Sequence, residues 1–193
     1  MNLGIYLHIP YCIHKCGYCD FNSHPENREE ASLYVNALLK ELKSYSSLMF
    51  NHTVSTIYMG GGTPTILTPF QLKRVLHTVL LNFNLSHNCE ITIEANPATI
   101  KLQTLKEIRF AGYNRISIGV QSFDKNELQT LERIHNEEEI HSTVKLARAA
   151  RFQNLSMDLM FALPKQTVEK WQSNLKKAIF KNPDHLSTYN LTI

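Results

Sequence analysis

Basic residues form no run or stripe in this 193-residue chain, and the formal net charge is only +3. A charge this small and this scattered does not indicate a nucleic-acid-binding surface. Eighteen consecutive apolar residues occur nowhere, so we expect no membrane span. The first apolar segment is too short for the core of a secretory signal, and asparagine at position 2 excludes N-myristoylation. We therefore expect a cytoplasmic protein of ordinary globular composition.

The spacing of apolar residues switches between a period of two and a period near three and a half, which predicts strands alternating with helices. The expected strands are 3–9, 55–59, 90–95, 115–120, 155–159 and 186–193. One helix is expected to start near Glu29. The others are expected at 69–83, at 101–111, in a region ending near Arg151, and at 168–180. This alternation predicts a parallel α/β sheet with right-handed crossovers, either doubly wound or part of a TIM-like barrel.

Unusual residues fall at or near the C-terminal ends of successive expected strands. They are Cys12, Gly60–Gly62, Glu94, Gln121 and Asp158. In a barrel that rim carries the active site, so we favour a partial TIM-like (β/α)6 barrel. The chain stops inside its last expected strand, so we expect residues 1–193 to be one incomplete domain of a longer polypeptide.

Three of the four cysteines lie within eight residues, as Cys12-x-x-x-Cys16-x-x-Cys19, in the loop after the first strand. A 4Fe–4S cluster held by three thiolates keeps one iron without a protein ligand, and the amino and carboxylate groups of S-adenosylmethionine (SAM) can chelate it. An electron from the reduced cluster can then cleave the sulfonium. We favour this interpretation of the loop. Cys89 precedes an apolar strand and is expected to be a small buried hydrophobe.

Three alternatives compete with the cluster. A zinc site needs a fourth ligand, for which the candidates are His8, His14, Asp20 and His24. A disulfide would leave one cysteine over and is uncommon in the cytosol. Structural cysteines would not gather in a loop that contains glycine.

The cysteine spacing resembles that of the radical SAM superfamily. The stretches Tyr6-Leu7-His8-Ile9-Pro10-Tyr11-Cys12 and Cys16-Gly17-Tyr18-Cys19-Asp20-Phe21 resemble, more narrowly, the oxygen-independent coproporphyrinogen III oxidases and their HemW-type relatives. The resemblance implies a radical SAM core domain with a 4Fe–4S cluster on Cys12, Cys16 and Cys19. It also implies bound SAM, with Tyr6 and Tyr18 beside the cofactors.

Gly60-Gly61-Gly62-Thr63-Pro64 follows the second strand and, by itself, indicates a tight turn or a close backbone approach to a ligand. No Gly-Lys-Ser/Thr follows, which disfavours a phosphate loop. The segment resembles the one that holds the methionine moiety of SAM in this family, which implies that role for Gly61, Gly62 and Thr63.

Glu94 ends an apolar strand, where a lone acid could also be a helix cap or part of an ion pair. Its match to the family's Glu-x-x-Pro segment implies a contact with SAM. Asp158 has apolar neighbours, and a buried acid needs a partner, for which Arg133 is a candidate. In the oxidases the residues matching Gln121, Arg133 and Asp158 contact a second SAM.

The oxidases have a fourth cysteine two positions after the third cluster cysteine, where this chain has Phe21. That substitution is typical of the HemW-type branch, regarded as heme chaperones, and it disfavours oxidative decarboxylation. The resemblance implies heme as bound cargo, with heme-acceptor proteins and an electron donor as partners. A coproporphyrinogen oxidase and a zinc-stabilised binding module are the alternatives.

The chain departs from the branch at two further positions, because Glu132 and Ala162 stand where glycine is usual. The family's remaining barrel and its C-terminal domain, which carries a motif linked to heme, are expected beyond Ile193.

Overall fold

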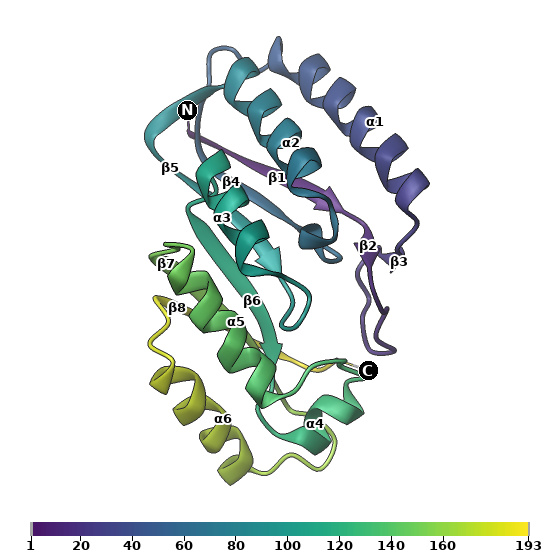
Figure 1. The fold of residues 1–193 in the computed structure, drawn as a ribbon, viewed down its shortest axis with the longest axis vertical. Coiled ribbons are helices and arrows are strands. Elements are labelled where there is room, and N and C mark those ends of the chain that lie inside the picture. The colour runs from purple at the N-terminus through teal and green to yellow at the C-terminus, as the bar shows by residue number, and fades with distance from the viewer. Residues whose placement is uncertain (1, 193) are drawn as a thin grey trace.

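The computed structural model describes residues 2–192 and contains a parallel six-stranded sheet (Figure 1). Its strands are β1 (Asn2–Ile9), β4 (Thr53–Gly61), β5 (Asn84–Ala95), β6 (Arg115–Gln121), β7 (Asn154–Phe161) and β8 (His185–Asn190). The strands follow one another in space in the order of the chain. A doubly wound sheet would reverse direction at one strand, so this order confirms the partial barrel. Ile193, the end of the expected last strand, lies outside the described residues.

Helices connect the strands, and Figure 1 shows most of them in a row along one face of the sheet. They are α1 (Arg28–Ser46), α2 (Pro69–Asn82), α3 (Leu102–Ala111), α4 (Lys125–Thr130), α5 (Glu137–Ala149) and α6 (Val168–Phe180). Helices gather on one face because every crossover between neighbouring parallel strands has the same hand. Within residues 2–192 no helix combines the length and apolar composition that crossing a bilayer requires.

Capping side chains fix where several helices begin. Thr68 and Gln71 form a reciprocal capping box at α2, and Asn136 and Glu139 form another at α5. The second box also explains one difference from the expected pattern. The helical region predicted to end near Arg151 is two helices, and α5 starts afresh at its own cap after a non-helical segment.

The main core lies between the helices and the sheet. Fully buried strand residues such as Ile57, Ile93 and Ile116 meet helix residues such as Leu72 and Leu105. Each of these side chains removes apolar area from water at roughly 25 cal/mol per Å². The helices cover one face of the sheet, and the site forms from the strand ends and the loops that follow them.

Register between neighbouring strands brings the loop residues to one edge. Ile9 pairs with Gly61 across β1 and β4, so the cysteine loop and the glycine turn leave the sheet side by side. Gly119 pairs with Asp158 across β6 and β7 in the same way.

The cysteine loop is closed by a short pairing that the sequence pattern did not predict. This pairing joins β2 (Tyr11–Cys12) to β3 (His24–Pro25). A second addition is a short 3₁₀ turn at Pro64–Ile66 after the glycines. β5 also begins six residues before the expected 90, in a polar stretch without alternation, where its register with β4 is irregular.

Candidate functional site

A cavity of about 310 Å³ opens at the C-terminal ends of the strands. The predicted site residues that line it are Cys12, Cys16, Tyr18, Cys19, Gly61, Gly62, Thr63, Glu94, Gln121, Arg133 and Asp158. Tyr6 is not among the lining residues; its ring stacks near Tyr58, and its hydroxyl lies 3.0 Å from Nδ1 of His8. Eleven of the twelve predicted cofactor and metal residues therefore converge on one cavity from five strands and the segments that follow them.

The three clustered cysteines are free thiols that face this cavity. The β2–β3 pairing closes their loop, and the Lys15 ammonium donates to the Ser23 carbonyl at 2.7 Å. Cys16 is buried, whereas Cys12 and Cys19 are half-buried. Cys89 is also buried, but it lies in β5 away from the cavity, as expected.

Polar groups of other loops approach the cysteine sulfurs. The Thr63 hydroxyl lies 3.8 Å from Sγ of Cys12, and Nη1 of Arg133 lies 4.0 Å from Sγ of Cys16. Burial raises the pKa of the Cys16 thiol, and the Arg133 guanidinium counteracts this by stabilising the thiolate. Donors aimed at cysteine sulfurs are a means by which proteins tune an iron–sulfur cluster.

The donor set fits a 4Fe–4S cluster. Three thiolates line a cavity with donors beside two of them, and Nε of Arg133 is buried without a partner. Each thiolate of such a cluster binds a different iron, so the three need not converge on one point. Within the described part of the chain, no group of three or more His, Cys, Asp or Glu side chains is arranged to hold a single metal ion.

The glycine turn lies directly against the cysteine loop. A Cβ at Gly62 would stand 2.5 Å from the main-chain oxygen of Tyr11, so only glycine fits there. Gly61 has φ +112°, which also favours glycine. The Gly62 amide donates to the Ile9 carbonyl at 2.7 Å, and the Thr63 amide donates to the Tyr11 carbonyl at 2.7 Å. These contacts fix the turn that the resemblance assigns to SAM.

Within residues 2–192, Glu94 neither caps a helix nor forms an ion pair. Its Oε1 accepts a hydrogen bond from the Tyr58 hydroxyl at 2.6 Å, and its Oε2 accepts one from the Gly61 amide at 3.1 Å. Burial raises the pKa of this carboxyl to about 7, although both hydrogen bonds favour the charged form. The carboxyl therefore changes charge near neutral pH.

Arg133 does not pair with Asp158, and the sequence-based expectation is wrong on this point. Its Nη2 donates instead to Oδ1 of Asn96 at 2.6 Å and to the Gly119 carbonyl at 2.9 Å. Asp158 accepts from the Ser117 hydroxyl, which lies 3.0 and 3.1 Å from its two oxygens. Burial raises the pKa of Asp158, and its serine hydrogen bonds work against that shift. Serine hydroxyls thus bond to this acid in place of the expected arginine.

The sequence analysis missed Asn96, which lines the cavity, and two residues that bond to the cavity acids. Asn96 joins the glycine turn to the arginine, because its Nδ2 donates to Oγ1 of Thr63 at 2.7 Å. Its position two residues after Glu94 was the signal in the sequence that could have identified it. Tyr58 and Ser117 lie inside strands, and only the fold shows which acid each one contacts. Phe21, noted for its branch, also lines the cavity and is 63% exposed.

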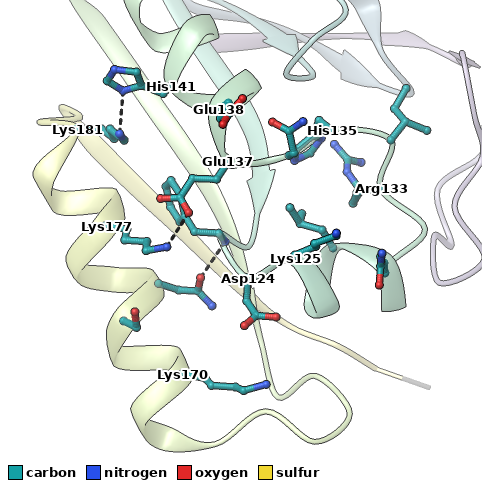
Figure 2. A pocket seen from close by; sticks show the side chains of 17 residues that line it. Asp124, Lys125, Arg133, His135, Glu137, Glu138, His141, Lys170, Lys177 and Lys181 are labelled. Carbon is teal, nitrogen blue, oxygen red and sulfur yellow. Dashed lines mark hydrogen bonds and ion pairs between the residues drawn. The ribbon is translucent and has the colours of Figure 1, made fainter.

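A larger cavity of about 1060 Å³ lies among α4, α5 and α6 (Figure 2). In Figure 2 Lys177 points to Glu137 and Lys181 points to His141, at 2.7 and 2.8 Å. His135 also lines this cavity, and burial lowers its pKa to about 4. Of the predicted site residues only Arg133 lines both cavities. The cofactor residues therefore belong to the smaller cavity.

Comparison with known proteins agrees with this geometry. The sequence profile of the radical SAM superfamily matches residues 6–178. The Escherichia coli K12 protein named heme chaperone HemW is 42% identical over 99% of this chain and 51% of its own length. The oxygen-independent coproporphyrinogen III oxidase of Salmonella typhimurium is 36% identical over 97% of this chain and 41% of its own.

A solved structure gives the same result for the fold. The coproporphyrinogen III oxidase HemN of Escherichia coli, described as a radical SAM enzyme, superposes with a TM-score of 0.89. It is 36% identical, and the match covers 98% of this chain and 44% of that one. The chain thus spans about half the length of the relatives it matches.

Proposed function

The chain belongs to the radical SAM superfamily, and from that premise we propose that it is the cofactor-binding part of a heme chaperone. In this proposal Cys12, Cys16 and Cys19 hold a 4Fe–4S cluster and the adjoining cavity holds SAM. The complete protein binds heme and transfers it to acceptor proteins, and an electron donor reduces the cluster. Thiolate ligands need a reducing compartment, which supports the cytoplasm as its location.

One observation carries the proposal: the three cysteines line the same cavity as Phe21, and no further cysteine lines it among the described residues. The cluster, when bound, supplies an electron and an iron with an open coordination position. A fourth cysteine, which the resemblance associates with the decarboxylating oxidases, is replaced by an aromatic ring at the cavity. The identity to a protein named heme chaperone supports the same branch.

The remaining cavity residues are assigned to SAM by their chemistry. Gly61, Gly62 and Thr63 line the cavity at a turn whose amides already donate within the protein, so a ligand would meet carbonyl oxygens there. The Glu94 carboxylate, held by Tyr58, can accept hydrogen bonds from an amino group or from hydroxyls. Gln121 in β6 and Asp158 in the neighbouring strand β7 line the same cavity.

Oxidative decarboxylation of coproporphyrinogen is the second candidate function. It is favoured by the TM-score of 0.89 to a coproporphyrinogen oxidase. A zinc-stabilised binding module is the third, and it differs from the other two in the metal bound. Metal analysis separates them, with about four irons and four sulfides per chain against one zinc ion.

The test uses the complete protein, reconstituted with iron and sulfide without oxygen. Cys16→Ser should abolish the cluster absorbance, whereas Cys89→Ser should retain it. The pair is well matched, because both cysteines are 8% exposed and only Cys16 faces the cavity. Reconstituted protein should bind heme and leave coproporphyrinogen III unchanged. Decarboxylation without heme binding would overturn the chaperone proposal in favour of the oxidase.

A further inference from the structure

Glu132 adopts a backbone conformation that glutamate rarely takes. Its φ is +52°, in the left-handed region where a Cβ is crowded by the following carbonyl group. Glycine would adopt this conformation without that cost. A residue held in such a conformation persists when its surroundings over-determine it, and the reason must lie in its contacts.

Besides a local hydrogen bond from its amide to the Gln129 carbonyl, Glu132 makes three contacts with the cysteine loop, more than 110 residues earlier in the chain. Its Oε2 accepts a hydrogen bond from the Gly17 amide at 2.9 Å. The same oxygen lies 3.4 Å from Nε2 of His14. Its main-chain oxygen lies 3.7 Å from Sγ of Cys16. Side chain and main chain therefore contact the loop together.

The next residue anchors this contact to the barrel. Arg133 donates to Asn96 and to the Gly119 carbonyl, so the segment carrying Glu132 is fixed to the ends of β5 and β6. The carboxylate also fills the space beside Gly17, where an added Cβ would meet its oxygen at 3.1 Å. The cysteine loop is thus connected to the barrel through Glu132.

We propose that Glu132 is a positioning residue that clamps the loop between Cys12 and Cys19 in the shape that holds the cluster. It does not bind iron. Its carboxylate orders the Gly17 amide, and its negative charge lies beside the cluster site. The inference rests on the proposed cluster and goes beyond it, since the resemblance assigns no role to this position.

The clamp is tested in the complete, reconstituted protein by the rate of cluster loss in two variants and by the cluster's reduction potential in one of them. Glu132→Ala removes a hydrogen bond to a charged but exposed group. A chelator should therefore remove the cluster about fivefold faster than it does from wild type. Glu132→Gln keeps an acceptor for the Gly17 amide and should lose the cluster at the wild-type rate. The cluster of Glu132→Gln should have a higher reduction potential than that of wild type, because one negative charge near the cluster is gone. Glu138→Gln removes an exposed glutamate of α5 and should change neither quantity.

Glu132→Gly separates the clamp from a general loss of stability. Glycine relieves the backbone strain, so the thermal midpoint of the cluster-free variant should be no lower than that of wild type. The cluster should nevertheless leave faster. Wild-type retention in both the alanine and the glycine variants would refute the clamp while leaving the proposed function intact. Failure of wild-type protein to form a cluster would overturn both.

Discussion

The Tyr58 hydroxyl is expected to set the pH above which SAM binds well. It donates to Oε1 of Glu94 at 2.6 Å, and burial raises the pKa of that carboxyl to about 7. The hydrogen bond acts against burial because it stabilises the charged carboxylate. Replacing Tyr58 with phenylalanine should therefore raise the pKa of Glu94 further.

The size of the effect follows from the hydrogen bond that is lost. A hydrogen bond to a charged group contributes roughly 1.5–3 kcal/mol, and we take the lower end because Glu94 is not fully buried. About 1.4 kcal/mol corresponds to about one pKa unit. At pH 7 the ionised fraction of Glu94 should then fall from about one half to about one tenth. The dissociation constant for SAM should rise about fivefold at pH 7 and hardly at all near pH 9.

Calorimetric titration of SAM into the complete, reconstituted protein between about pH 6 and pH 9 measures this. Tyr113→Phe is the matched control, because Tyr113 is buried and its hydroxyl donates to the Leu72 carbonyl at 3.1 Å, away from the cavity. The control should leave the pH profile unchanged. A Tyr58→Phe defect of the same size at every pH would refute the ionisation argument and assign the loss to packing.

Three further predictions concern stability in the cluster-free protein. Glu94 keeps its proton in the folded state to a higher pH than in the unfolded chain, where its pKa is 4.5. The free energy of unfolding should therefore fall by about 2–3 kcal/mol as the pH rises from 4.5 to 7; Glu94→Gln should remove this pH dependence from denaturation curves. Ala162→Gly should stabilise by about 1 kcal/mol in urea unfolding, since φ there is +59°; a loss would contradict the strain. Asn174→Ala should cost about 2–3 kcal/mol, because it leaves the Phe123 amide buried without a partner and removes one of the two hydrogen bonds that the buried Glu127 side chain accepts; thermal unfolding checks this.

Much of the fold could be predicted because it depends on local periodicity. The strands ending at Ile9, Ala95 and Gln121 alternate or run apolar up to a proline or a polar residue, and the sheet contains each of them. The rim of the barrel then gathers residues that are far apart in the sequence. That step needs only the rule that parallel strands end at one edge, and the cavity residues follow it.

What could not be predicted depends on geometry between loops. The partner of Asp158 is a serine hydroxyl, because the pairing of β6 with β7 places Ser117 beside it. Arg133, in the loop after α4, bonds to Asn96 instead. Glutamate at 132 gives by itself no indication of a left-handed conformation, and the one signal was the glycine that is usual there in the family it resembles. Neither fact is encoded in residue spacing.

The sequential strand order bears on how the protein assembles during synthesis. Each new strand pairs with one already made, so the sheet can grow as the chain emerges from the ribosome. The cysteines appear first, yet Arg133 follows Cys16 by 117 residues and Asp158 comes later still. The cysteine thiols therefore lie in an incomplete site until β7 has been translated. Iron and sulfide delivered before then would find the three thiol ligands but not the residues that line the rest of the cavity.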